Sequence, residues 1–252
     1  MRVEAVLFDL FNTLVLLEDG DAFYLPSLKK LHRFLVKSGV KVSFETFESV
    51  YFQVRDMLYS ESEKTLEEPH FRVRISRTLQ QLGYDFGVTH PLVIGATEAF
   101  CMEFMRYISL DEDAIHVLRR LHGKYRLGIV SNFAMPECAE KLFDKFDLNK
   151  FFDVVVISAA VNRRKPSPEI FRTALTAMGV RASETVFVGD TPAMDVTGPR
   201  NVGIRSVLIK RKTSPPSDSI SLVYKSPNKV VNIEPDHVIE SLRELLTVLE
   251  DC

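Results

Sequence analysis

The 252-residue sequence has few cysteines, no hydrophobic run as long as a membrane span and no internal repeat or low-complexity tract. The three cysteines, Cys101, Cys138 and Cys252, are odd in number and lack the spacing of metal ligands. We therefore expect unpaired packing residues and a reducing compartment rather than a disulfide scaffold. Because the first residues show no signal-peptide pattern and no segment could span a bilayer, we expect a cytoplasmic protein.

The sequence also lacks an excess of charge of either sign. Lys and Arg total 32 and Asp and Glu total 34, which gives a formal net charge of -2. This balance provides no surface that follows a polyphosphate, so we expect no nucleic acid and no membrane as partners. A small-molecule substrate, including an anionic one, is compatible with it. We expect a monomer or a homodimer.

Short apolar runs alternate with amphipathic helical segments along most of the chain, which predicts an α/β fold with a doubly wound parallel sheet. The predicted strands cover residues 5–8, 125–130, 154–158, 185–189 and 204–209. At 252 residues the chain is long enough for such a domain and a second, smaller one.

The segment between the first two strands contains no convincing strand. Its apolar residues recur at helical spacing. The predicted helices cover residues 23–37, 43–60, 71–82 and 90–107. We therefore expect residues 1–16 and 108–252 to form the α/β core and residues 17–107 to form an inserted all-α cap that acts as a lid.

Toward the end of the chain the pattern is less regular. Residues 210–227 are rich in serine and proline and predict a loop, with a short hairpin at residues 221–224. An edge strand is expected at residues 230–233 and a closing amphipathic helix at residues 238–249.

Polar side chains follow four of the predicted strands. They are Asp9, Ser131 with Asn132, Lys165, and Asp190 with Asp195. In open α/β sheets, ligands bind beyond the carboxyl ends of the strands, so we expect these side chains to share one site. Taken alone, each acid could cap a turn or a helix, and so could the Ser-Asn pair. The lysine alone could be a solvated loop residue. The combination is more specific than any of its parts.

In order, spacing and strand context, these clusters resemble the haloacid dehalogenase (HAD) superfamily of hydrolases. The matching segments are Asp9–Leu14, Val130–Asn132, Arg164–Phe171 and Val188–Asp195. The likeness covers the core from Val3 to about Lys210. The helical insert between the first two segments is similar to the C1-type cap of subfamily I. The resemblance implies a Rossmann-type core and hydrolysis of a small molecule.

Asp9 suits the role of nucleophile. Its carboxylate would form a covalent ester or acyl phosphate, which splits a difficult displacement into two steps. A carboxylate repels a phosphate dianion, and a hard cation such as magnesium (Mg²⁺) removes this repulsion. Asp9, Asp190 and Asp195 supply oxygen ligands for such an ion. The resemblance adds the backbone carbonyl of Phe11 as a further ligand.

The remaining candidates would bind the substrate. We expect the hydroxyl of Ser131, the amide or backbone N–H of Asn132 and the ammonium of Lys165 to hold the non-reacting phosphate oxygens and to act in catalysis. Phe11 and Thr13, which lie in the first matching segment, are expected to contribute to the substrate site.

Phe11 departs from the pattern of HAD phosphatases, which usually carry a second aspartate two residues after the nucleophile. That aspartate protonates the leaving oxygen, whereas a benzyl side chain transfers no proton. A cap residue could replace it, and the candidates are Asp19, Asp21, Arg55, Tyr59 and His70. The 2-haloacid dehalogenases of the superfamily carry an aromatic residue at this position, because halide departs unprotonated. Their fourth motif, however, is a Ser/Asn-rich loop with one acid.

We therefore expect a Mg²⁺-dependent phosphatase that acts on a small phosphate ester through an aspartyl-phosphate on Asp9. One alternative is a metal-independent 2-haloacid dehalogenase that forms an ester on Asp9. Another is a non-catalytic module that binds phosphate or another ligand. Asp190 and Asp195 favour the phosphatase. Without a cation, their negative charge would raise the pKa of Asp9 and keep this nucleophile in its protonated, unreactive form.

Overall fold

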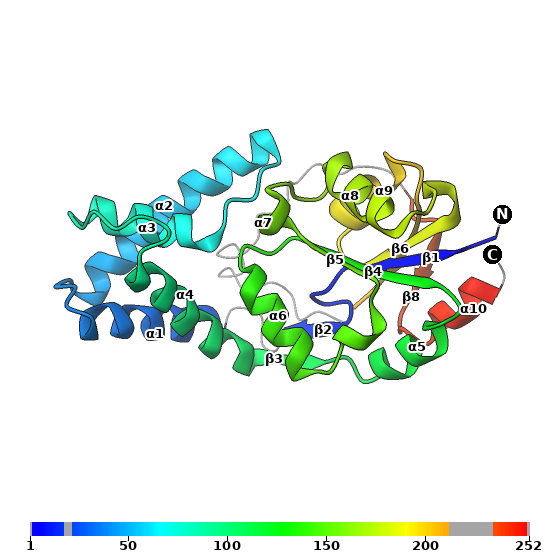
Figure 1. Cartoon of the computed structure of the whole chain (residues 1–252), viewed down its shortest axis with the longest axis horizontal. Coiled ribbons are helices and arrows are strands. Elements are labelled where there is room, and N and C mark those ends of the chain that lie inside the picture. The colour runs from blue at the N-terminus through cyan, green and yellow to red at the C-terminus, as the bar shows by residue number, and fades with distance from the viewer. Residues whose placement is uncertain (1, 18–21, 212–233, 251–252) are drawn as a thin grey trace.

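The computed structural model describes residues 2–17, 22–211 and 234–250 of the chain. Six strands form one parallel sheet in the order β5-β4-β1-β6-β7-β8 (Figure 1). Their bounds are β1 Ala5–Phe8, β4 Arg126–Ser131, β5 Val154–Ile157, β6 Thr185–Gly189, β7 Arg205–Ile209 and β8 His237–Ile239. The expected doubly wound parallel sheet is confirmed.

Helices cover both faces of this sheet, and the alternation of side chains along β1 shows how. Val6 and Phe8 join the larger core cluster, which includes α5 (Ala114–Leu121), α6 (Pro136–Lys145) and α10 (Glu244–Glu250). Ala5 and Leu7 point to the opposite face and pack with α8 (Pro168–Met178). All four residues of β1 are fully buried, as expected for a central strand of a parallel sheet.

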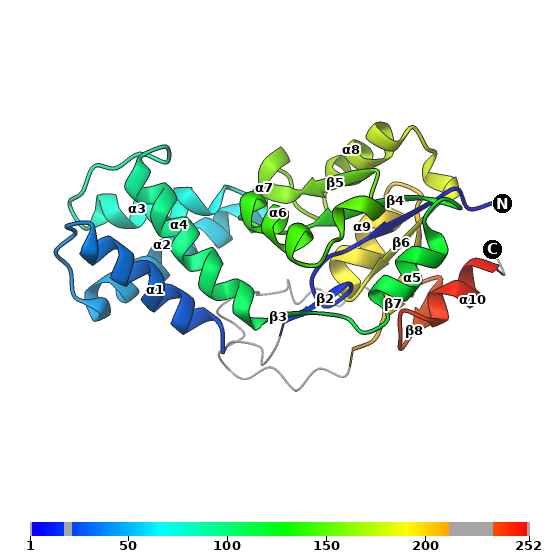
Figure 2. The same cartoon turned by 60° about the horizontal axis from the view of Figure 1, so that its bottom comes forward.

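The helical insert consists of four helices that lie to one side of the sheet (Figures 1 and 2). They are α1 Tyr24–Lys37, α2 Phe44–Thr65, α3 Phe71–Gln81 and α4 Pro91–Phe104, followed by the 3-10 turn η1 Met105–Tyr107. The Ser43 hydroxyl accepts the N–H of Thr46 at 3.2 Å and caps α2. We call α1–α4 the cap.

Two strands that the sequence did not predict join the cap to the core. β2 (Val15–Leu17) pairs antiparallel with β3 (Ile108–Leu110), so the chain enters and leaves the cap through one two-stranded connection. We call this pair the hinge ladder. Each strand has only three residues, too few for an alternating pattern to be recognised in the sequence.

The remaining elements are short. They are α7 Ser158–Val161, α9 Thr197–Arg200, the 3-10 turns η2 Asn149–Phe151 and η3 Ala182–Glu184, and the π-helical turn η4 Pro192–Val196. The predicted closing helix begins too early, because His237–Ile239 forms the edge strand β8 and α10 starts at Glu244. The hairpin and edge strand expected at residues 221–224 and 230–233 lie outside the described residues.

Cys101 and Cys138 form a disulfide, so the expectation that both are unpaired is wrong. Cys101 lies on α4 of the cap and Cys138 on α6 of the core, and their Cα atoms are 5.8 Å apart. The two positions are 37 residues apart in the sequence, and only the packing of one helix against the other brings them together. Cys252 lies outside the described residues.

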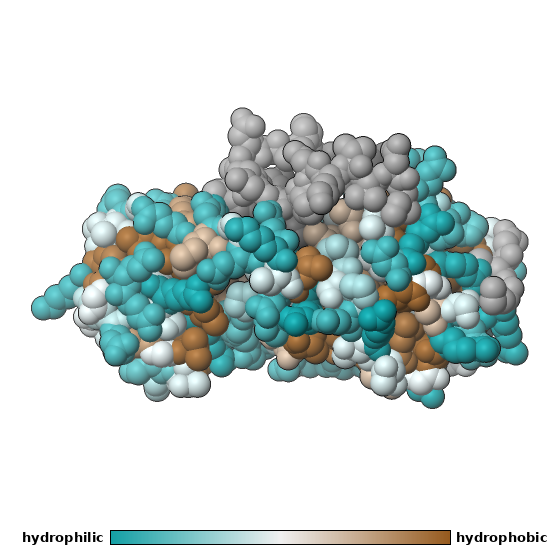
Figure 3. Space-filling view, turned by 90° about the horizontal axis from the view of Figure 1, so that it is seen from above, coloured by the Kyte–Doolittle hydropathy of each residue, from teal (hydrophilic) through white to brown (hydrophobic). Residues whose placement is uncertain are grey.

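Among residues 2–17, 22–211 and 234–250, no helix is both long enough and apolar enough to cross a bilayer. On the face seen in Figure 3, hydrophobic residues are scattered among polar ones.

Candidate active site

Three carboxylates meet beyond the carboxyl ends of β1 and β6. Asp9 follows β1 directly, Asp190 follows β6, and Asp195 lies in η4. Phe8 of β1 pairs with Val188 of β6, so the two strands end side by side. One oxygen from each acid lies within 4.8 Å of the others, which brings together the three acids that the sequence predicted.

Gly189 makes room for the third acid. A Cβ atom at this position would overlap the carboxyl group of Asp195, so no larger residue fits without displacing that side chain. The carboxyl group is held in place by the backbone N–H of Thr191, which donates to its Oδ2 at 2.9 Å. This role of Gly189 could not be predicted from the sequence, because it depends on a contact that forms only in the folded chain.

Lys165 lies between the carboxylates. Its Nζ donates to Oδ1 of Asp9 and to Oδ1 of Asp195, each at 2.7 Å, and its side chain is 2% exposed. Burial alone would lower the pKa of Lys165, but the attraction of Asp195 and Asp9 outweighs it and raises the pKa. The lysine is therefore a permanent cation in this site.

One ammonium group does not neutralise three buried acids. Burial and the repulsion of Asp195 raise the pKa of Asp9 to about 6, even though Lys165 opposes the shift. Burial, with the repulsion of Asp9 and then Asp195, raises the pKa of Asp190 to about 7. A cluster of hard oxygen donors with excess negative charge fits a divalent cation such as Mg²⁺.

Two hydroxyls among the residues expected to bind the substrate are buried without a partner in the part of the chain that the structure describes. The Oγ of Ser131, at the end of β4, and the Oγ1 of Thr13 have no hydrogen-bond partner among the described residues. Both side chains are almost completely buried. A buried hydroxyl without a partner is costly, so each of these groups calls for an explanation such as a bound ligand or water.

Asn132 is occupied in a different way. Its Nδ2 donates to the backbone carbonyl of Lys165 at 3.0 Å, and its Oδ1 accepts the backbone N–H of Lys165 at 2.7 Å. The side-chain amide therefore orients the loop that carries the lysine. The side-chain amide, one of the two groups that the sequence offered for the substrate, is thus bonded within the protein.

Phe11, two residues after the nucleophile, packs in an aromatic cluster between core and cap. Its ring centroid lies 4.8 Å from that of Phe133 and 6.0 Å from that of Phe104, which belongs to cap helix α4. The side chain is partly buried in this aromatic cluster. An apolar ring, packed among aromatic side chains, therefore occupies the sequence position expected for a second aspartate.

The cap residues considered as replacement acids are engaged elsewhere or not described. Nδ1 of His70 accepts the N–H of Arg72 at 3.0 Å, and its Nε2 bonds Glu137 at 2.9 Å, so both ring nitrogens are used. Arg55 bonds the carboxylate of its neighbour, Asp56. The Tyr59 ring lies under a guanidinium group. The other two candidates, at positions 19 and 21, lie outside the described residues.

Arg211 supports the loop that follows the nucleophile, and sequence reasoning missed it. Its guanidinium donates to the carbonyl oxygens of Asn12 at 2.8 Å and Thr13 at 2.5 Å. It also forms an ion pair with Asp111, at 2.8 Å, just after the hinge ladder. No sequence signal marked this residue, because it lies about 200 residues from the loop that it holds.

Comparisons with known proteins agree with this architecture. The family model described as haloacid dehalogenase-like hydrolase matches residues 3–203, and a related HAD-like hydrolase model matches residues 162–245. A glyceraldehyde 3-phosphate phosphatase of Pyrococcus furiosus is 28% identical over 252 residues, covering 99% of this chain and 94% of the relative. The human N-acylneuraminate-9-phosphatase is 24% identical, covering 100% of this chain and 96% of the relative.

Solved structures show the same fold. A 2-haloacid dehalogenase from Pseudomonas syringae pv. Tomato DC3000 superposes with a TM-score of 0.73 at 21% identity, covering 99% of each chain. A HAD phosphatase from Thermococcus onnurineus gives a TM-score of 0.63 at 24% identity, covering 98% of each chain. With the family model spanning most of the sequence, the chain belongs to the haloacid dehalogenase-like hydrolases.

Proposed function

We propose that this hydrolase is a Mg²⁺-dependent phosphatase of small phosphate esters, with Asp9 as the nucleophile. The observation that carries the proposal is the cluster of Asp9, Asp190 and Asp195, whose oxygens lie within 4.8 Å of one another beside a buried lysine. The relatives described as phosphatases support it independently.

The proposed reaction has two displacements on phosphorus. The carboxylate of Asp9 attacks the phosphorus atom, and the bond to the ester oxygen breaks as the acyl phosphate forms; the alcohol leaves as its oxyanion and takes up a proton from solvent. Water then attacks the acyl phosphate, loses a proton to solvent and releases inorganic phosphate, which restores the carboxylate. The hydroxyl of Ser131 and the ammonium of Lys165 hold the equatorial oxygens while their charge changes.

Three acids and one carbonyl would hold the metal ion. They are the carboxylates of Asp9, Asp190 and Asp195 and the backbone carbonyl of Phe11. When bound, Mg²⁺ supplies positive charge that offsets the repulsion between a carboxylate and a phosphate dianion. Lys165 also supplies positive charge that offsets this repulsion. Its two ion pairs hold Asp9 and Asp195 on either side of a fixed ammonium group.

The phenylalanine at position 11 limits the proposed enzyme. Loss of general acid and base catalysis costs about two to four orders of magnitude in rate. Esters whose leaving groups need no proton, such as aryl phosphates, should be affected least. We therefore propose that alkyl phosphates are poor substrates unless they bring their own acidic group.

Dehalogenation of a 2-haloacid is the second candidate. Phe11 favours it, because the aromatic cluster around this ring suits an apolar alkyl group and halide leaves without a proton. Asp190 and Asp195 in the fourth motif are evidence against dehalogenation. Without a cation, their negative charge would favour the protonated form of Asp9, which is a poor nucleophile. The third candidate is a module that binds phosphate without turnover.

One panel of assays separates the three candidates. Purified protein is incubated with p-nitrophenyl phosphate, glyceraldehyde 3-phosphate, phosphoserine and 2-chloropropionate, with Mg²⁺ or with chelator. The proposal predicts release of phosphate with Mg²⁺ only, abolished by Asp9→Asn. Chloride release in chelator would instead establish a dehalogenase. Phosphate binding in calorimetry, without turnover of any substrate, would identify a binding module.

A further inference from the structure

Core helix α6 carries several of the contacts between core and cap, in addition to the buried ion pair of Arg164 with Glu68. On α6, Glu137 bonds His70 and Arg72 of the cap, and Cys138 forms the disulfide with α4. One turn farther, Lys141 forms an ion pair with Glu98 of α4 at 2.9 Å. Lys145, the last residue of the helix, donates to the backbone carbonyls of Met105 in η1 and Ile108 in β3, where the chain returns from the cap.

These contacts differ greatly in strength. The side chains of Glu137, Lys141 and Glu98 are 42%, 41% and 57% exposed, and ion pairs this exposed contribute little. The hinge ladder attaches the cap through a pair of three-residue strands, Val15–Leu17 and Ile108–Leu110. The disulfide is therefore the strongest link between α6 and the cap.

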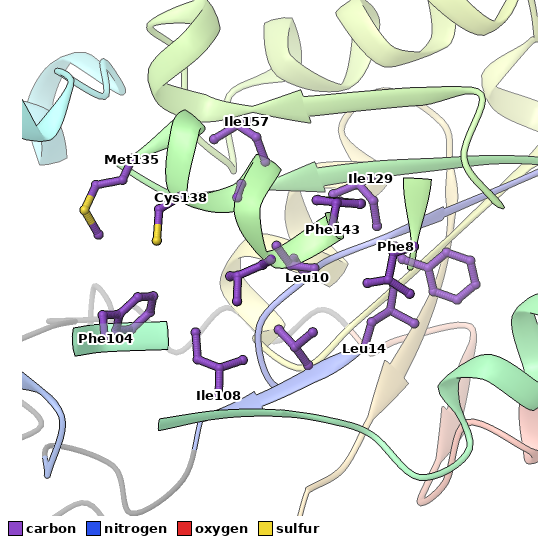
Figure 4. Close-up of a cluster of buried hydrophobic side chains, with 14 of the residues drawn as sticks. Phe8, Leu10, Leu14, Phe104, Ile108, Ile129, Met135, Cys138, Phe143 and Ile157 are labelled. Carbon is purple, nitrogen blue, oxygen red and sulfur yellow. The ribbon is translucent and has the colours of Figure 1, made fainter. Parts of the chain in front are cut away.

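The disulfide also lies close to the proposed site. Cys101 is three residues before Phe104 on α4, and the Phe104 ring contacts both Phe11 and Phe133. Figure 4 shows the sulfur of Cys138 directed toward the helix that carries Phe104. A bond that fixes this part of α4 thus also fixes the contacts of Phe104 with Phe11, two residues after Asp9, and with Phe133, next to Asn132.

Both sulfurs are shielded from solvent. Cys101 is 3% exposed and Cys138 is 1% exposed, and both belong to the hydrophobic cluster that continues from the core into the cap. A reagent that oxidises or reduces the pair can reach it only when α4 and α6 separate.

We infer that Cys101 and Cys138 form a redox-operated tether, which holds the cap against the core as a disulfide and releases it as two thiols. Substrate entry and product release require the cap to move in enzymes with a covering element. Oxidation would therefore slow turnover, and reduction would restore it. The effect on turnover rests on the proposed function, whereas the tether itself does not.

The oxidant that forms the Cys101–Cys138 bond would be a low-molecular-weight disulfide such as glutathione disulfide, which accepts the two electrons. One cysteine thiolate attacks a sulfur of glutathione disulfide and releases one glutathione thiolate. The second cysteine thiolate attacks the protein-bound sulfur, which forms the Cys101–Cys138 bond and releases the second glutathione. Two electrons pass to glutathione disulfide, and the two thiol protons go to the released glutathione thiolates.

The test compares the full-length protein equilibrated in reducing and in oxidising glutathione buffers. After alkylation of free thiols, peptide mapping identifies the disulfide, and hydrogen exchange reports on residues 15–17 and 108–110 of the hinge ladder. Turnover of p-nitrophenyl phosphate is measured in parallel. We expect oxidation to form the Cys101–Cys138 peptide, to slow exchange in the ladder and to lower kcat by about tenfold or more.

The variants have distinct outcomes. Cys101→Ser and Cys138→Ser should each lose the redox dependence of exchange and turnover, while Cys252→Ser should keep it. Absence of the linked peptide in oxidised protein, or equal exchange in the two buffers, would overturn the tether. Slower exchange on oxidation in a protein that turns over no phosphate ester would support the tether and refute the proposed function instead.

Discussion

Replacing Phe11 with aspartate restores a carboxyl group at the position where HAD phosphatases usually have one. If a leaving-group proton limits the proposed phosphatase, Phe11→Asp should raise the rate on alkyl phosphates. General acid and base catalysis contributes about two to four orders of magnitude, so a gain of at least about tenfold is expected even from imperfect geometry. Aryl phosphates, whose leaving groups need little protonation, should gain much less.

The same substitution removes a packed ring. The Phe11 ring centroid lies 4.8 Å from that of Phe133 and 6.0 Å from that of Phe104. An aromatic pair contributes about 0.5–1.5 kcal/mol beyond area burial, so losing both contacts should lower the free energy of unfolding by about 1–3 kcal/mol. Urea denaturation of wild type and variant measures this cost.

Phe11→Asn is the matched control. It has the same shape as the aspartate variant and the same packing loss, but it has no acid. Steady-state rates on glycerol phosphate and p-nitrophenyl phosphate, with Mg²⁺, distinguish the variants. Equal rates for the aspartate and asparagine variants on the alkyl ester would refute the reasoning that a missing proton limits turnover.

Three further perturbations test the metal cluster. Gly189→Ala places a Cβ against the carboxyl group of Asp195, so calorimetry should show loss of Mg²⁺ binding, whereas Gly87→Ala, in open space, should bind normally. In the folded protein the pKa of Asp190 is raised from 3.8 to about 7, so between these values the folded state binds more protons than the unfolded chain. In chelator, the melting temperature should therefore rise as the pH is lowered from 7 to 3.8. Mg²⁺ should abolish this trend. Lys165→Met leaves the buried acids without their ammonium partner. Urea denaturation at pH 8 in chelator should therefore show a decrease in the free energy of unfolding of about 3 kcal/mol or more. The decrease should be smaller at acidic pH, where the acids are protonated.

The sheet and the catalytic loops could be predicted because their signal is local. Buried parallel strands are continuous apolar runs, and the polar residues that follow them mark the strand ends. The parallel pairing of β1 with β4 and β6 then forces Asp9, Ser131 and Asp190 together without any further information.

Other features depend on tertiary contacts that no local pattern encodes. β8 has two exposed residues out of three, so His237–Ile239 carries no core signal and reads as part of the following helix. The roles of Gly189 and Arg211 arise from side chains that approach only in the folded chain. The same holds for the Cys101–Cys138 disulfide, which required the docking of α4 on α6.

The most direct test of the account is a crystal structure of the protein grown with Mn²⁺ and beryllium fluoride, a mimic of the acyl phosphate. We expect beryllium bonded to the carboxylate of Asp9, and an anomalous Mn²⁺ peak coordinated by Asp9, Asp190 and Asp195. A structure with the fluoride complex elsewhere, or with no metal among these carboxylates at saturating Mn²⁺, would contradict it.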